Sequence, residues 1–151
     1  MSDPIKHECG VALIRLRKPL EFYRDKYGTE LYGLKKLQML MSKQLNRGQD
    51  GAGLAAIKLN PDYGSRYIAR ERAIGSGAVS TLFDRLNKRY HSLNPEKVNN
   101  TSWLRKKYPY AGELLLGHLR YATHGKNSIE NVHPFLHPEN DQFFQAWLHY
   151  H

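Results

Sequence analysis

A single cysteine, Cys9, opens the first strongly apolar run of this 151-residue chain. One cysteine excludes an internal disulfide, so the fold must be held by burial of apolar side chains, and a reducing compartment is expected. The chain has 40% hydrophobic and 25% charged residues, which suits one domain with its own core. The apolar run after Cys9 is too short to span a bilayer. We therefore expect a cytoplasmic protein with no membrane segment.

The chain is strongly basic, with a formal net charge of +9 at pH 7. Much of this charge lies in two patches, at residues 15–18 and 105–107. Positive charge attracts nucleic acid at low salt. However, the sequence has no aromatic-basic ribonucleoprotein pattern, no paired Cys/His zinc spacing and no helix-turn-helix signal. The charge pattern therefore favours a solvated basic surface over a nucleic-acid-binding module.

Apolar spacing and turn residues predict the order strand, helix, two strands, helix, strand. The predicted helices begin near Leu31 and Ser80, and the first runs for about four turns between an N-cap at Thr29 and a stop at Gly48. Two stretches carry no such pattern: 21–28 is polar, and 91–110 resembles a surface insertion. The strands are expected at 9–16, 51–59, 67–70 and 113–121. This order indicates an α+β or α/β fold.

Three segments, taken together, carry a resemblance to a known family. They are Cys-Gly-Val-Ala at 9–12, Asn-Arg-Gly-Gln-Asp-Gly-Ala-Gly at 46–53, and Gly-His-Leu-Arg-Tyr-Ala-Thr-His-Gly at 117–125. Asn-Val-His-Pro-Phe follows the third segment, at 131–135. In this order they resemble the glutaminase domain of class II glutamine amidotransferases, and most of all the amidophosphoribosyltransferase branch of purine biosynthesis. The resemblance covers residues 9–135, with 91–110 unmatched.

The resemblance implies an α+β fold of the N-terminal nucleophile hydrolase type, an αββα sandwich that is incomplete at its C-terminal end. It divides the chain into a leader at 1–8, which is removed, a partial glutamine amidotransferase type 2 domain at 9–140, and an atypical tail at 141–151. The tail is aromatic, and a short helix and a shifted reading frame are both open interpretations. No cofactor is expected in this domain.

Cys9 is the expected nucleophile for hydrolysis of an amide. A thiol has a pKa near 8.5 and an α-amino group one of about 7.7–8.0, so at neutral pH a minority of such amines are neutral and can accept the thiol proton. An amine on the same Cα is held within reach by covalent geometry. We therefore predict that removal of residues 1–8 exposes Cys9. The alternative is that Cys9 is a buried strand residue.

The resemblance also implies a set of substrate-binding residues. Arg120 would grip the α-carboxylate of glutamine with two parallel hydrogen bonds, the geometry that suits a guanidinium. Thr123 and His124 would contact the ligand. Arg47 would help to orient the terminal cysteine, and Gly48 would permit close approach of the backbone. The alternatives are a surface ion pair for Arg120 and a helix cap for Gly48.

Histidine spacing gives no metal motif. His118, His124, His133 and His137 fall within twenty positions, but the one pair at i, i+4 spacing is separated by Pro134, which disfavours a helix. We expect no metal site.

Two features of the family have no counterpart after Phe135. The Asn-Gly pair that forms the oxyanion hole is absent, and so is the phosphoribosyltransferase domain. Loss of one oxyanion donor costs about a hundred- to a thousand-fold in turnover. Two interpretations therefore stay open: a glutaminase that releases ammonia through a thioester on Cys9, or an inactive domain that binds a partner.

Glutamine is the substrate that the resemblance implies, with phosphoribosyl pyrophosphate as the acceptor of ammonia. A sugar phosphate or an asparagine precursor are the alternative acceptors. The transferase would be supplied by a missing domain or by a partner chain, and a homo-oligomer is also open.

Overall fold

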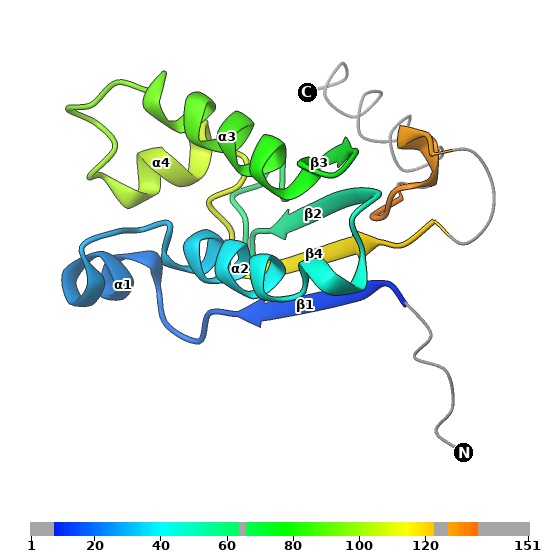
Figure 1. Cartoon of the computed structure of the whole chain (residues 1–151). Helices are drawn as coiled ribbons and strands as arrows, with labels where there is room; N and C mark the ends of the chain where they lie inside the picture. Colours follow the sequence, from blue (N-terminus) through cyan, green and yellow to red (C-terminus); the bar gives the residue numbers. More distant parts are fainter. Residues whose placement is uncertain (1–7, 64–65, 123–126, 136–151) are drawn as a thin grey trace.

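A four-stranded antiparallel sheet forms the centre of the protein (Figure 1). The computed structural model describes residues 8–63, 66–122 and 127–135. The strands lie in the order β1-β4-β2-β3, and each neighbouring pair is antiparallel. The strands are β1 (Gly10–Arg15), β2 (Gly51–Ile57), β3 (Ile68–Ile74) and β4 (Leu114–Arg120). With the helices below, this confirms the α+β class.

Two helices, α2 (Tyr32–Lys43) and α3 (Ala78–His91), lie across one face of the sheet (Figure 1). Two shorter helices, α1 (Leu20–Tyr27) and α4 (Thr101–Lys107), lie beyond one end of it. Single 3-10 turns, η1 (Leu45–Arg47) and η2 (Ile129–Asn131), complete the elements. In the described part of the chain, no helix has both the length and the apolar character needed to cross a membrane.

The core lies between the sheet and helices α2 and α3. Apolar residues on α2 recur three and four positions apart, which places them on the face turned to the sheet. On β2 every second side chain points to the helices, as the pleat requires. Full burial of one leucine stabilises a fold by roughly 1.5–3 kcal/mol. The fully buried members from these elements include Leu37, Met41, Ala52, Leu54, Ala56 and Leu82.

The opposite face of the sheet is partly open. On β1, Val11 and Leu13 are 58% and 63% exposed, whereas Ala12 between them is buried. Residues 132–134 cover part of this face, and they can lie flat on β2 because Gly53 has no side chain. A Cβ atom there would collide with the carbonyl oxygen of His133. Nη1 of Arg72 donates a 3.0 Å hydrogen bond to the carbonyl of Val132, which fixes the segment.

The end of α2 differs from the prediction. The helix ends at Lys43, and Gly48 has extended backbone with φ −163° rather than the conformation of a helix cap. Gly48 therefore does not cap α2, and it follows the 3-10 turn at 45–47 instead. Thr29 accepts a 3.2 Å hydrogen bond from the amide of Leu31, which is itself the N-cap, so Thr29 stabilises the turn before the helix.

Two regions without an apolar pattern are helical. The polar stretch 21–28 forms most of α1. The region 91–110 is not a surface insertion, because it contains α4 and because Leu104 and Tyr108 are 0% and 1% exposed. Asn100 caps α4 by accepting a 2.9 Å hydrogen bond from the amide of Trp103. The predicted tail at 141–151 lies outside the described residues, as does all of the predicted leader except Glu8.

Candidate active site

The three sequence motifs meet at one end of the sheet. Strand β1 begins where β4 ends, and β2 begins beside them (Figure 1). Gly10 lies opposite Leu119, and Gly51 lies opposite Arg120. Cys9, which precedes β1, is therefore held next to the last residues of β4 by the hydrogen-bond register.

Cys9 is exposed, and its sulfur lies 4.0 Å from the carbonyl oxygen of Tyr121. The alternative of a buried strand cysteine is therefore wrong. If the register continues by one residue, Cys9 faces Arg120, and directly opposed residues share one face of a sheet with Cβ atoms about 5 Å apart. This is the face turned away from α2 and α3. A nucleophile and a cation are thus brought together from distant parts of the sequence.

Arg120 is a buried cation, with 7% of its surface exposed. The ion pairs of the described residues do not include it, so the alternative of a surface ion pair is wrong. Buried charges usually have a partner, and a guanidinium suits a carboxylate. The arrangement can therefore accept the carboxylate of a ligand.

His118 lies on the same face of β4, two residues before Arg120. Burial lowers the pKa of His118, and the neighbouring His133 and Arg120 lower it further. Its Nδ1 atom is buried without a hydrogen-bond partner among the residues described. The ring of His133 lies 5.0 Å from that of His118, between centroids. Neutral imidazole at this position is therefore favoured at neutral pH.

Gly48 packs directly on the backbone of Arg120. A Cβ atom at Gly48 would lie 2.7 Å from the carbonyl carbon of Arg120 and 2.8 Å from its oxygen. Such distances are well below van der Waals contact, so a larger residue would push the end of β4 away. Arg47 is the last residue of η1 and is exposed.

Asp50 is a positioning residue for which the sequence analysis assigned no role. Its carboxylate accepts a 2.8 Å hydrogen bond from the amide of Ala122, and its own amide donates to the carbonyl of Arg120 at 3.1 Å. The carbonyl of Asp50 also accepts from the amide of Gly75 at 2.9 Å. Asp50 therefore fixes the chain that leaves β4. An acidic residue directly before a glycine-led strand was the signal in the sequence.

Gln44 anchors the start of β1 and was also missed. Its Nε2 atom donates a 3.4 Å hydrogen bond to the carbonyl of Val11. A Cβ atom at Gly10 would lie 2.9 Å from Oε1 of Gln44, so the glycine after Cys9 gives this side chain room. No local pattern marks this contact, because it joins residues far apart in the chain.

Thr123, His124 and His137 lie outside the described residues. Within the ranges that are described, no group of three or more His, Cys, Asp or Glu side chains could hold a metal ion.

Comparison with known proteins gives three relatives. Amidophosphoribosyltransferase 3, chloroplastic, of Arabidopsis thaliana is 31% identical over 135 residues, which is 89% of this chain. Glutamine–fructose-6-phosphate aminotransferase (isomerizing) of Encephalitozoon cuniculi is 34% identical over 111 residues, or 74% of the chain. The enzyme of the same name from Gluconobacter oxydans is 31% identical over 88 residues, or 58%. The resemblance to class II glutamine amidotransferases is confirmed.

The chain spans only a small part of these relatives. It covers 18%, 12% and 10% of their respective lengths. No family model matches the chain. The matched portion is therefore a domain-sized piece of much longer proteins.

Proposed function

We propose that this chain is a glutaminase domain that hydrolyses glutamine to glutamate and ammonia. The observation that carries the proposal is the exposed sulfur of Cys9 beside the end of β4, where Arg120 is buried without a described carboxylate partner. A thiol next to a site for a carboxylate is the arrangement that attack on glutamine requires. The confirmed resemblance supports the same activity.

In the proposed mechanism, residues 1–8 are removed and Cys9 carries a free α-amino group. The neutral amine takes the thiol proton, and the sulfur attacks the side-chain carbonyl carbon of glutamine. The tetrahedral intermediate collapses as its C–N bond breaks, and the α-ammonium group returns the proton to the leaving ammonia. Water then hydrolyses the thioester, which releases glutamate and restores the thiol.

The remaining residues bind and orient the substrate. Arg120 holds the α-carboxylate of glutamine by two parallel hydrogen bonds. Thr123 and His124, which follow it in the chain, contact the bound ligand. Arg47 helps to orient Cys9, and Gly48 lets the backbone after η1 lie close to the end of β4.

We also propose that the domain has the architecture of an N-terminal nucleophile hydrolase. The exposed apolar side chains of Val11 and Leu13 lie on the face of the sheet opposite α2 and α3. A second sheet packed on that face would give the αββα sandwich of N-terminal nucleophile hydrolases. Because these residues are 58% and 63% exposed, burial of what remains of both side chains would contribute roughly 2–4 kcal/mol.

We further propose that the ammonia is delivered to phosphoribosyl pyrophosphate in purine biosynthesis. The relative matched over 89% of the chain is an amidophosphoribosyltransferase, which supports this acceptor. The names of the other two relatives support fructose 6-phosphate as the alternative. Either acceptor would be bound by a further domain or by a partner chain, and the glutaminase step itself uses no cofactor.

Release of ammonia and glutamate from glutamine tests the proposal. A chain that begins at Cys9 should turn over glutamine, whereas the chain that retains residues 1–8 and the Cys9→Ala variant should not. Equal activity with and without residues 1–8 would contradict the role of the α-amino group.

A second candidate function is an inactive domain that binds a ligand or partner. It is the second of the two interpretations that the sequence leaves open. Calorimetry separates the two functions. Saturable binding of glutamine to the chain that begins at Cys9, with no release of ammonia, would establish the inactive domain.

A further inference from the structure

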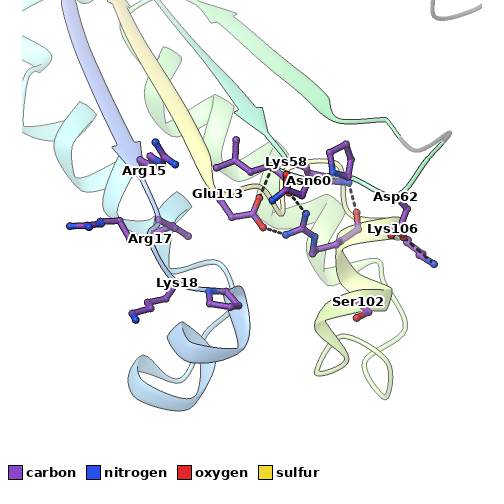
Figure 2. A pocket seen from close by; sticks show the side chains of 14 residues that line it. Arg15, Arg17, Lys18, Lys58, Asn60, Asp62, Ser102, Lys106 and Glu113 are labelled. Atoms are coloured by element: carbon purple, nitrogen blue, oxygen red, sulfur yellow. Dashed lines mark hydrogen bonds and ion pairs between the residues drawn. The ribbon is translucent and has the colours of Figure 1, made fainter.

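A large basic cavity lies at the end of the sheet opposite Cys9 (Figure 2). Its volume is about 840 Å³. One wall is the segment 15–19 after β1, and the other is formed by α4 and the start of the loop after β2, with Glu113 between the two walls. Because β1 has six residues, the cavity is about 20 Å along the strand from Cys9. It is therefore separate from the candidate active site.

The charges around the cavity are unbalanced. Of the described residues, six cationic side chains line it, against two carboxylates, Asp62 and Glu113. Both carboxylates already form ion pairs, Glu113 with Arg105 and Asp62 with Lys106 at 3.2 Å. The remaining four cations have no carboxylate partner in the described part of the chain. They are Arg15, Arg17, Lys18 and Lys58.

The burial of Lys58 gives this excess of positive charge a free-energy cost. It is only 5% exposed, and its ammonium group donates a hydrogen bond to the carbonyl of Arg105, a neutral acceptor. Burial lowers the pKa of Lys58, and the nearby charges of Arg105 and Arg66 act in the same direction. Buried lysines are rare unless they are paired with an opposite charge. An anion in the cavity would provide that charge.

The wall around Lys58 is held by a network of hydrogen bonds. Glu113 accepts a 2.8 Å hydrogen bond from the amide of Leu59, in addition to its ion pair with Arg105. Arg105 donates from Nη2 to the carbonyl of Leu59 at 2.9 Å. Figure 2 shows Glu113 beside Lys58. Lys58 and Arg105 are thus held by an ordered scaffold, which reduces the entropy lost when a ligand binds.

We propose that this cavity binds a small, non-aromatic compound that carries two or more phosphate groups. Cations on both walls of one concavity suit a polyanion, and its volume lies within the range of about 300–1,000 Å³ that is usual for small-molecule sites. Among the residues that the structure describes, no aromatic side chain lines the cavity, so these residues offer no platform on which a nucleobase could stack. This favours a small phosphorylated ligand over single-stranded nucleic acid.

Isothermal titration calorimetry with inorganic pyrophosphate tests the site in the full chain, at constant ionic strength of about 0.15 M. Saturable binding is expected. The triple variant Arg15→Gln/Arg17→Gln/Lys18→Gln should weaken it at least tenfold. The matched control, Lys35→Gln/Lys43→Gln/Lys88→Gln, removes the same charge from exposed positions on α2 and α3 and should stay within twofold of the wild type.

A second variant, Lys58→Met, keeps the length of the side chain and removes the buried charge. It should weaken pyrophosphate binding at least tenfold without lowering the midpoint of thermal unfolding. Absence of saturable binding, or equal loss in both triple variants, would overturn the proposal. So would a 12-nucleotide single-stranded DNA that displaces pyrophosphate and still binds Lys58→Met, because that result would identify a nucleic-acid surface instead.

Discussion

The carboxylate of Asp50 accepts a 2.8 Å hydrogen bond from the backbone amide of Ala122, and so ties the start of β2 to the chain that leaves β4. A hydrogen bond to a charged group contributes about 1.5–3 kcal/mol. We predict that Asp50→Ala lowers the free energy of unfolding by about 2 kcal/mol, as measured by urea denaturation. Asp84→Ala removes the same charge from an exposed position on α3 and should change stability by less than about 0.5 kcal/mol.

The contact between Gly48 and Arg120 leaves no room for a methyl group. We predict that Gly48→Ala destabilises the protein by about 1–3 kcal/mol, the usual cost of overpacking. Thermal unfolding measures this cost against Gly77→Ala, because a Cβ atom at Gly77 would meet nothing within 4 Å. An equal loss of stability in Gly48→Ala and Gly77→Ala would show that the backbone around Gly48 accommodates a methyl group without a free-energy cost.

Arg120 is proposed to bind glutamine through two parallel hydrogen bonds. Lysine keeps the charge but cannot reproduce this geometry. In a chain that begins at Cys9, we therefore predict that Arg120→Lys raises KM for glutamine about tenfold or more and changes kcat less. Arg85→Lys, on the exposed side of α3, is the control and should match the parent. An unchanged KM in Arg120→Lys would remove Arg120 from the substrate site.

The buried ring of His118 predicts a dependence of stability on pH. Its pKa is lowered in the folded state, so below about pH 6.5 the unfolded chain binds a proton that the folded chain resists. Stability should therefore fall as the pH falls through this range. Urea denaturation at pH 7.5, 6.5 and 5.5 should show a smaller fall in His118→Gln than in the wild type. An equal loss of stability in the wild type and in His118→Gln would show that His118 is not the source of the pH dependence.

Much of the sheet could be predicted from sequence because its strands carry local signals. The strand after Cys9 and the glycine-led strand after Asp50 are short apolar runs bounded by turn residues, and both lie close to the predicted positions. The adjacency of Cys9 and Arg120 was available from the family resemblance alone. Antiparallel pairing of the first and last strands is a long-range contact, which no local pattern encodes.

The helices beyond the end of the sheet could not be predicted in the same way. Leu104 and Tyr108 are four residues apart on one face, but the basic residues between them hide this short pattern. In α1 the buried side chain is Leu20 alone, so its polar sequence resembles a loop. Asp50 and Gln44 were missed for a related reason, because their partners Ala122 and Val11 are distant in sequence.

The most direct measurement is the mass of the Cys9 peptide after the chain that begins at Cys9 is mixed with glutamine and quenched in acid. A glutamyl group should appear on Cys9, and it should be absent from Cys9→Ala and from the chain that retains residues 1–8. Release of ammonia without any adduct on Cys9, or an adduct of equal abundance when residues 1–8 are retained, would contradict nucleophilic attack by a terminal cysteine.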